Sequence, residues 1–356
     1  MVVATSYQML NMVDKNQPLS SKMKAMVVKK CWFSSILEQR EVKMPEIKDH
    51  EVLIKVWAVG VNRDDIIDVA TSVDGVCPGL ECSGIIEAVG RNVSCWKVGE
   101  RVCAILEGGG YAEHVAVPAN FLLPLPEDID LDDAAGLPYA SCLSLLALLK
   151  LNETKTPNKT ILIREGSNGI GTLAIQYAKY MGFKVIASTG SSDRFAICHH
   201  YGADFCVDHT LTNFARTVIE KARRIGVDLV LDYGASNLQS NIECCRIMGK
   251  VKIVIVDLHG MESSNIDLSI LQRKQVEIKV FDLRSKDLGY KASVITEIRT
   301  HLWPAVLQQK VVPAIEYRFP VTEYQKAMNI LRKDDSAGKI ILCMNFGQDS
   351  DSLKMD

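Results

Sequence analysis

The sequence predicts an α/β protein in which a doubly wound parallel sheet adjoins a β-rich domain built as a partly open barrel. In the first third of the chain, short strand-like segments are separated by Gly, Pro, Asn and Asp. From about residue 131, strand patterns rich in β-branched residues alternate with helical patterns, which is typical of a parallel sheet covered by helices. A glycine-rich segment joins one of these strands to the next helix.

Length, composition and net charge indicate an ordinary globular protein. The 356 residues suffice for two domains, and 47% hydrophobic with 24% charged residues is an ordinary globular balance. A net charge of -2 provides no basic surface, and the most apolar stretch, 143–149, is too short to span a bilayer, so we expect neither nucleic-acid nor membrane binding. The eleven cysteines are scattered without a C-x-x-C pair, which indicates reduced thiols and a cytoplasmic protein.

The predicted domains follow the change in pattern. Residues 1–23 lack the basic start and apolar core of a targeting peptide and are expected to form a flexible extension. Residues 24–141 should form the β-rich domain, and residues 142–284 the nucleotide-binding domain. Residues 285–356 end in a strand, a helix and a strand (316–345), and we expect this tail to return to the first domain.

Helices and strands of the second half are predicted in turn from their periodicity. The helices are expected at 132–151, 171–182, 193–202, 214–226, 236–249 and 290–309. The strands are expected at 161–165, 184–189, 205–209, 227–234, 250–256 and 276–283.

The glycine-rich segment EGSNGIG (165–171) lies between a predicted strand and a predicted helix, where a dinucleotide site is found. Glycines allow the backbone to approach a pyrophosphate, whose charge is bound by N–H groups at the helix N-terminus. The spacing is G-x-x-G-x-G, and a purely structural tight turn is the alternative. The predicted cofactor contacts from this segment are Gly166, Ser167, Asn168, Gly169, Ile170 and Gly171.

The end of the next strand predicts which dinucleotide binds. An NAD site has Asp or Glu there, whereas this chain has Ser188 to Ser191, small and neutral, followed by Arg194. We expect Ser191 and Arg194 to bind the 2′-phosphate of NADPH, the alternative for Arg194 being a solvated charge. The fourth strand ends at Tyr233, where we expect the nicotinamide.

Several segments together resemble one known family. VNRDD (61–65), PGLECSGIIEAVG (78–90), GGGYAEHVAVP (108–118), AAGLP (134–138), the glycine-rich turn and GKIIL near the end are similar to medium-chain dehydrogenase/reductases, most of all the zinc-free quinone oxidoreductase (zeta-crystallin-like) branch. The resemblance covers residues 24–345. It implies a Rossmann domain (142–284), a GroES-like domain (24–141 and 285–356), and a homodimer paired through strand 276–283.

The zinc alcohol dehydrogenases of this superfamily have His-Glu where this chain has Leu80-Glu81, and Cys where it has Asn62. Leucine cannot bind zinc, and no four-Cys lobe is present, so we expect no metal. Without a Lewis acid, the expected reaction is hydride transfer from NADPH to a quinone or an α,β-unsaturated carbonyl. Glu81 is expected to be a buried carboxylate that holds loops.

The resemblance also assigns the remaining site residues. It places Asn62 beside nicotinamide and substrate as the catalytic residue, with a turn-forming Asn as the alternative. Tyr111 either lines the substrate cleft or packs on the barrel. His209 stands where the family often has a Tyr near the 2′-phosphate, with a surface histidine as the alternative.

The chain departs from the family pattern at three places. A Tyr five or six residues after Asn62 is missing, Leu143 stands where a Thr usually touches nicotinamide, and Glu165 stands where Gly is common. Two other functions therefore stay open: an enoyl-thioester reductase on the same fold, and a non-catalytic NADPH-binding protein.

Overall fold

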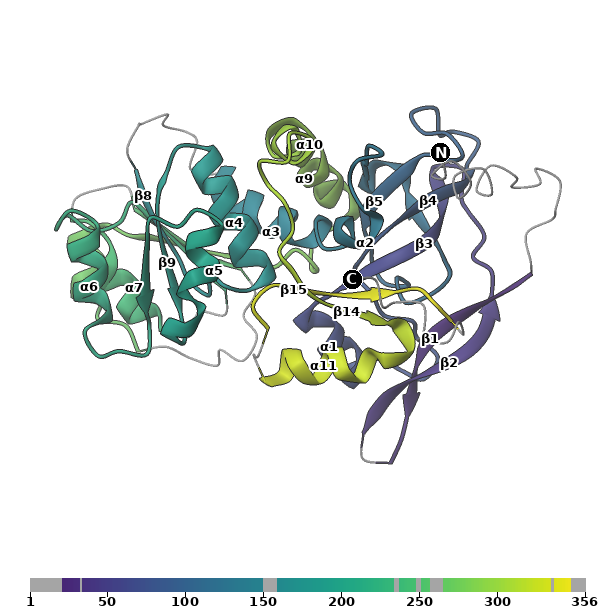
Figure 1. Ribbon diagram of the computed structural model, residues 1–356, viewed down its shortest axis with the longest axis horizontal. Helices are drawn as coiled ribbons and strands as arrows, with labels where there is room; N and C mark the ends of the chain where they lie inside the picture. Colours follow the sequence, from purple (N-terminus) through teal and green to yellow (C-terminus); the bar gives the residue numbers. More distant parts are fainter. Residues whose placement is uncertain are drawn as a thin grey trace, which may run out of the picture.

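The computed structural model describes residues 21–32, 34–149, 159–233, 237–247, 251–256, 265–333 and 336–346. Two large sheets lie side by side, the parallel sheet at the left of Figure 1 and the mostly antiparallel sheet at the right. Most of the predicted extension 1–23 lies outside the described residues; at its end, strand β1 already begins at Lys22.

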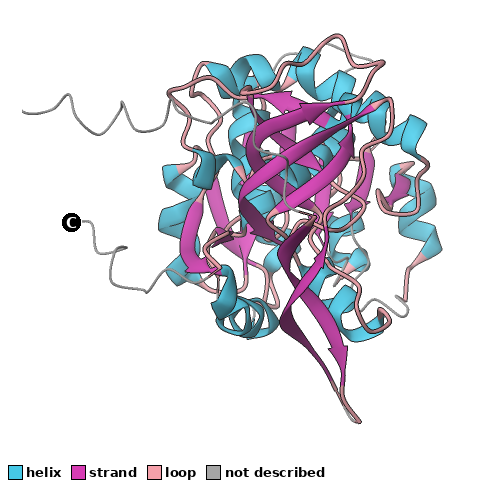
Figure 2. Ribbon diagram, turned by 90° about the vertical axis from the view of Figure 1, so that its right-hand side faces the viewer, coloured by secondary structure: helices cyan, strands magenta, loops and turns pink. Residues whose placement is uncertain are grey.

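The first domain is built on a seven-stranded sheet whose main path runs β14-β15-β3-β4-β5-β7, with β6 pairing β3. Its strands are β3 (Glu51–Val61), β4 (Glu81–Val89), β5 (Arg101–Ile105), β6 (His114–Pro118), β7 (Leu122–Pro124), β14 (Ile315–Pro320) and β15 (Lys339–Cys343). A separate antiparallel hairpin, β1 (Lys22–Lys30) with β2 (Ser35–Lys43), projects from the body in Figure 2. This is the predicted β-rich, GroES-like domain.

The second domain is a six-stranded parallel sheet in the order β10-β9-β8-β11-β12-β13, the doubly wound order that the sequence predicts. The strands are β8 (Thr160–Ile163), β9 (Lys184–Thr189), β10 (Phe205–Asp208), β11 (Leu229–Tyr233), β12 (Lys252–Val256) and β13 (Glu277–Phe281). The helices between them are α4 (Gly169–Tyr180), α5 (Phe195–His200), α6 (Phe214–Lys221), α7 (Leu238–Cys244) and α8 (Leu268–Lys274).

The last part of the chain returns to the first domain, as its pattern predicts. Strand β15 pairs antiparallel with β3, and β14 pairs parallel with β15. Helix α11 (Tyr324–Lys333) connects these two strands. The site therefore receives side chains from both ends of the first domain's sequence.

Four helical regions differ most from the prediction. Helices α1 (Arg63–Thr71) and α8 (Leu268–Lys274) were not predicted. The single helix expected at 290–309 is two, α9 (Leu288–His301) and α10 (Trp303–Leu307), because Pro304 can occupy only the first turn of a helix. The single helix expected at 132–151 is also two, α2 (Leu131–Ala134) and α3 (Pro138–Leu149). The chain turns at Gly136, and a new helix begins at Pro138, because proline is tolerated in the first turn of a helix.

Helix α3 connects the two domains. It packs against α4 and β12 of the nucleotide-binding domain and against β4 and β5 of the first domain (Figure 1). Residues Pro138 to Leu148 of this helix are buried, so the helix is covered on all sides and the core runs from one domain into the other. The side chains of α3 therefore lie at the junction where a cofactor would meet its substrate.

Candidate cofactor and active site

The glycine-rich turn links β8 to α4 in a conformation that depends on its glycines. Asn168 is the N-cap of α4: its Oδ1 accepts hydrogen bonds from the N–H groups of Ile170 (3.0 Å) and Gly171 (2.7 Å). A Cβ on Gly171 would lie 2.2 Å from the carbonyl oxygen of Glu165, a distance that no side chain tolerates. The turn is thus closed by backbone approach, as a dinucleotide site requires.

Two buried hydroxyl groups fit a bound dinucleotide. The Ser167 side chain in the turn is 1% exposed and its Oγ has no hydrogen-bond partner among the described residues. Ser141 in the first turn of α3 is also buried, and its Oγ likewise has no partner there. Since buried hydroxyls are normally hydrogen-bonded, a ligand with polar groups at both ends would satisfy them.

The predicted 2′-phosphate residues gather at one corner of the nucleotide-binding sheet. Ser191 and Arg194 follow β9, and His209 follows β10, whose neighbour in the sheet is β9. The His209 Nε2 atom lies 3.6 Å from the position that a Cβ on Gly190 would take. The fold therefore brings these three predicted residues to one place; their contact with a cofactor remains a prediction.

Glu165, a departure from the family pattern, has a partner at this corner. Its Oε1 lies 3.3 Å from His209 Nε2, and both side chains are largely buried. The residue adopts φ = 51°, the left-handed region that favours glycine and is strained for other residues. The carboxylate is thus turned toward His209.

A buried cluster of three polar side chains lies where the two domains meet. Lys339 Nζ is 2.6 Å from Glu81 Oε1 and donates a hydrogen bond of 2.6 Å to Asn62 Oδ1. Asn62 Nδ2 donates to the same Glu81 oxygen at 3.0 Å. All three residues are at most 5% exposed. Taking two charges out of water requires such close pairing, so this cluster fixes the orientation of the predicted catalytic Asn62.

Lys339 also touches the glycine-rich turn. Its backbone and aliphatic chain lie 3.0–3.1 Å from the position that a Cβ on Gly169 would take. Gly169 is therefore the residue that allows β15 of the first domain to approach α4 of the second. Lys339 is not among the predicted site residues, although a lysine at the start of the apolar strand KIILC is a signal that could have found it.

The Asn62 amide is fully engaged. Besides Glu81, its Nδ2 donates to the Gly60 carbonyl at 3.3 Å, and its Oδ1 accepts from Lys339. Its N–H donates to Asp65 Oδ2 at 2.7 Å, which anchors the start of α1. Asn62 is thus the N-cap of α1 as well as a member of the cluster, and its catalytic role remains a prediction.

Tyr111 and Tyr233 are placed differently relative to the predicted cleft. Tyr111 is completely buried beside Asp65, which corresponds to the packing alternative, and burial raises its pKa well above the usual value. The Tyr233 hydroxyl at the end of β11 is buried beside Ser144 of α3. Only Tyr233 therefore lies at the junction of the two domains.

Leu143, which stands where the family usually has a Thr that touches nicotinamide, lies in α3. The helix begins at Pro138, so Leu143 falls in its second turn, and its side chain is buried in the core. The hydroxyl-bearing residue of the first turn is Ser141. The first turn of α3 therefore carries a hydroxyl group, although the expected Thr is absent.

A second polar network crosses the domain junction next to the cluster. Arg284, which follows β13, pairs with Asp64 (3.2 Å) and Asp68 (2.6 Å) of α1. Asp64 also accepts a hydrogen bond of 2.6 Å from the hydroxyl of Tyr139. The Tyr that the family resemblance leads us to expect would stand at position 67 or 68. In this chain, position 68 is Asp68, which forms an ion pair with Arg284.

Tyr139 joins this network to the cluster and to a cavity. Its N–H donates to Glu81 Oε2 at 2.9 Å. A cavity of about 90 Å³ lies beside it, lined from the first domain by Leu80, Ile105, Leu106 and Glu107 and from the later part of the chain by Leu283, Arg284 and Lys291. Tyr139 thus lies both at the cluster and at a cavity in which an acceptor could be held.

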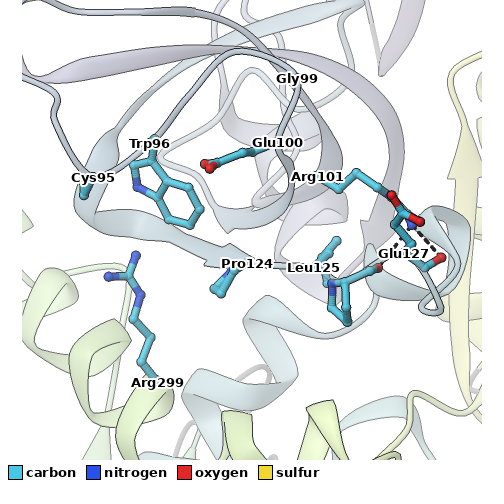
Figure 3. A pocket seen from close by; sticks show the side chains of 10 residues that line it. Cys95, Trp96, Gly99, Glu100, Arg101, Pro124, Leu125, Glu127 and Arg299 are labelled. Atoms are coloured by element: carbon cyan, nitrogen blue, oxygen red, sulfur yellow. Dashed lines mark hydrogen bonds between the residues drawn. The ribbon is translucent and has the colours of Figure 1, made fainter. Parts of the chain in front are cut away.

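A larger cavity, of about 620 Å³, lies in another part of the molecule (Figure 3). Arg299 of α9 and Trp96 face each other across it, the guanidinium 5.4 Å from the ring centroid. Arg101 is held at its rim by the backbone carbonyls of Pro126 and Glu127. None of its lining residues is a predicted site residue, so it is not part of the candidate site.

The described parts of the chain contain no group of three or more His, Cys, Asp or Glu side chains that could hold a metal ion. Among the described residues, no helix is long and apolar enough to cross a membrane.

Two adjoining sheets, a glycine-rich turn at the start of α4 and a buried polar cluster between the domains define a two-domain dinucleotide-binding protein. Family models support this class. The model described as "Alcohol dehydrogenase GroES-like domain" matches residues 48–127, and the one described as "Zinc-binding dehydrogenase" matches residues 169–296.

Among curated proteins, the chain is 33% identical over 229 residues to the quinone oxidoreductase of Sus scrofa, covering 61% of this chain and 68% of that protein. It is 27% identical over 319 residues to the synaptic vesicle membrane protein VAT-1 homolog of Danio rerio, 84% of this chain and 65% of the relative. It also matches a highly reducing polyketide synthase of Didymella fabae, at 28% identity over 311 residues, but spans only 16% of that protein.

Two solved structures have the same fold. The quinone oxidoreductase from Thermus thermophilus, solved also as its complex with NADPH, has a TM-score of 0.76 and 26% identity, covering 90% of this chain and all of that one. The CurK enoyl reductase has a TM-score of 0.79 at 21% identity, covering 92% of this chain and all of that one. The chain belongs to the medium-chain dehydrogenase/reductase superfamily, in its quinone oxidoreductase branch, as the motifs predict.

The first prediction concerns the buried pair. Lys339→Met leaves the Glu81 carboxylate buried without its cation, which should lower the free energy of unfolding by about 3–5 kcal/mol. Adding Glu81→Gln removes the charge and should restore most of that loss. Urea denaturation of both variants measures this.

Lys326→Met, which removes an exposed lysine paired with Glu323, is the matched control and should cost less than about 1 kcal/mol. Equal losses for Lys326→Met and Lys339→Met would contradict the interpretation of the cluster.

The second prediction concerns pH. Asp65 is completely buried, and burial raises its pKa to about 8, although the hydrogen bond from the Asn62 N–H opposes the shift. Between about pH 5 and 7 the unfolded chain has released this proton while the folded protein keeps it. The contribution of Asp65 to stability is therefore fully present below about pH 4 and is lost as the pH rises toward about 8.

Over that interval the stability of the wild type should fall, relative to Asp65→Asn, by about 1.4 kcal/mol per pH unit. Urea denaturation at a series of pH values measures the difference. Parallel pH profiles of the two proteins would show that Asp65 is ionised in the folded state.

Proposed function

We propose that the protein is an oxidoreductase that transfers hydride from NADPH to quinones or α,β-unsaturated carbonyls. The observation that carries the proposal is the Lys339–Glu81–Asn62 cluster, which packs against Gly169 of the glycine-rich turn. A buried polar cluster at that junction is suited to orient a group beside a bound nicotinamide. Membership of the quinone oxidoreductase branch supports the same reaction.

The residues present fit the dinucleotide. Gly166, Ser167 and Gly169 would lie along its diphosphate, and Tyr233 with Ser141 would lie near its nicotinamide. When bound, NADPH supplies the hydride. Negative charge then develops on the acceptor's carbonyl oxygen, and fixed donors in a water-poor cleft stabilise such charge.

We assign Asn62 the role of contacting the nicotinamide or this oxygen. Its Nδ2–H bond to the Gly60 carbonyl, 3.3 Å long, is the weakest of its interactions and the one that such a contact would replace. Lys339 and Glu81 act as positioning residues, because they hold both ends of the Asn62 amide.

NADPH is proposed over NADH because Arg194 and Ser191 follow β9 at a position where no acidic side chain ends the strand. Of the two nearby acids, Glu165 of the glycine-rich turn is paired with His209, and Asp193 accepts a hydrogen bond of 3.3 Å from the Ser191 hydroxyl. The Thermus thermophilus relative solved with NADPH supports the choice.

Two alternatives have specific support. An enoyl-thioester reductase is favoured by the likeness to the CurK enoyl reductase and to a segment of a fungal polyketide synthase. A non-catalytic NADPH-binding protein is favoured by the charged pair Asp68–Arg284 at the position of the missing family Tyr, and by a neighbouring cavity of only about 90 Å³. Binding pockets for small molecules are commonly several times larger.

We further propose a cytoplasmic homodimer. All eleven cysteines are free, which suits a reducing compartment. Strand β13 is the edge of the parallel sheet, and its Val280 is 51% exposed, so a second copy could extend the sheet there. Sedimentation equilibrium at micromolar concentration should give twice the chain mass; the mass of one chain would contradict the dimer.

The reaction is tested by incubating the protein with NADPH and a panel of quinones, enones and enoyl thioesters while NADPH absorbance is followed. We expect oxidation with quinones or enones. Turnover restricted to thioesters would establish the first alternative, and tight NADPH binding with no turnover on any acceptor would establish the second.

Cofactor choice is tested by fluorescence titration. Arg194→Gln should weaken NADPH binding about tenfold or more, the loss expected for one charge-assisted bond to phosphate, and leave NADH binding unchanged. Arg216→Gln, in an exposed pair with Glu220 on α6, is the matched control. Tighter binding of NADH than of NADPH by the wild type would overturn the assignment.

A further inference from the structure

Two cysteines form a neighbouring pair, and one of them lies against Gly166 of the glycine-rich turn. Cys198 is in α5 and Cys206 is in β10, and their thiols are in hydrogen-bonding contact. We propose that this pair is a redox-sensitive modification site: hydroperoxides oxidise it to an intramolecular disulfide that weakens dinucleotide binding. The proposal is independent of the acceptor that the protein reduces.

The local fold brings the two sulfur atoms together. Helix α5 ends with the N–H of Ala203 donating to the Cys198 carbonyl at 2.9 Å, after which the chain enters β10. The Cys206 thiol is also 3.7 Å from the carbonyl oxygen of Phe195, at the start of α5. The Cys206 sulfur therefore lies against α5, the helix that carries Cys198.

The two thiols differ in access and in acidity. Cys198 is completely buried, whereas Cys206 is only half-buried. The hydrogen bond from Cys198 lowers the pKa of Cys206, while that same bond, together with burial, raises the pKa of Cys198. Because the thiolate is the nucleophile, Cys206 is the attacking residue and Cys198 the resolving one.

The other closely placed cysteines are less suited to oxidation. Cys82 and Cys103 lie on adjacent strands, and Cys244 and Cys245 are neighbours in sequence. All four are buried, and burial raises the pKa of each. They are expected to remain thiols under conditions that oxidise the Cys198–Cys206 pair.

A hydroperoxide is the oxidant that converts the two thiols to a disulfide. The Cys206 thiolate attacks one peroxide oxygen, the O–O bond breaks, and water (or an alcohol) leaves, which gives a sulfenic acid. The Cys198 sulfur then attacks the Cys206 sulfur; the S–S bond forms, and the sulfenic oxygen leaves as water with the Cys198 proton. The two thiols lose two electrons and two protons, and the peroxide gains them.

The position of the pair connects this step to the cofactor. Cys198 Sγ lies 3.3 Å from the position that a Cβ on Gly166 would take, so it supports the underside of the turn. A disulfide requires the two sulfurs to approach to about 2.05 Å. Closing the bond shifts at least one of the two sulfurs, and a shift of Cys198 Sγ would change the packing against Gly166, beneath the residues that would hold the diphosphate.

The site is tested first on the full chain carrying Cys31→Ser and Cys95→Ser, which removes the two exposed thiols. After treatment with hydrogen peroxide, free thiols are alkylated and the digest is analysed by mass spectrometry. We expect a linked peptide pair containing Cys198 and Cys206, which disappears after reduction. Recovery of both residues as alkylated thiols would overturn the proposal.

Single variants test the order of the steps. In Cys198→Ser, Cys206 should stop at the sulfenic acid and be trapped by dimedone, and in Cys206→Ser no disulfide should form. A dimedone adduct on Cys198 in Cys206→Ser would overturn the assignment of the attacking residue. The linked peptide of the parent chain decides the existence of the site even if a variant fails to fold.

The coupling is measured by NADPH titration, a readout that rests on the proposed cofactor. Oxidation should weaken binding about tenfold, and reduction with dithiothreitol should restore it, whereas Cys206→Ser should not respond. Equal affinity in the two redox states would contradict the coupling. Absence of NADPH binding in the reduced protein would instead refute the proposed function. It would leave the disulfide proposal standing, because peptide mapping detects the disulfide without any cofactor.

Discussion

Lys339 and Glu81 are both withdrawn from water at the contact between the two domains, at a desolvation cost of several kcal/mol per charge. The fold offsets this cost by holding the ammonium nitrogen 2.6 Å from the carboxylate and by giving every remaining acceptor of the cluster a donor, from Asn62 and from the Tyr139 N–H. The pair therefore tolerates little displacement. Since Lys339 also lies against Gly169, the same constraint sets how closely the first domain approaches the glycine-rich turn.

Two carboxylates stand where the chain departs from the family pattern. Each of them is paired with a basic side chain from a distant part of the sequence. Asp68 is paired with Arg284 across the domain junction, and Glu165 is paired with His209 at the edge of the nucleotide-binding sheet. The first pair ties α1 to the segment after β13, next to the small cavity. The second keeps a carboxylate of the turn directed at a histidine. Each of these two carboxylates is thus balanced by a basic side chain close to it.

The sequence predicted the elements whose signal is local. Strand β9 is found at the predicted residues, and the doubly wound order, the glycine-rich turn and the return of the last strand to the first sheet all follow from pattern and motif. The cluster could not be predicted in the same way, because Asn62 and Lys339 are 277 residues apart and meet only through the pairing of β15 with β3. Helix α1 was not predicted because its polar first turn resembles a loop. The hydrogen bond from the Asn62 N–H to the Asp65 carboxylate, which caps the helix, is known only from the structure.

A crystal structure of the protein with NADPH is the most direct test of the view that one buried cluster organises the cofactor site. It should show the diphosphate over residues 166–171, the nicotinamide at the side of Asn62, and the Lys339 ammonium still in contact with Glu81. A dinucleotide bound elsewhere, or a complex in which Lys339 has left Glu81 to contact the ligand, would contradict the account.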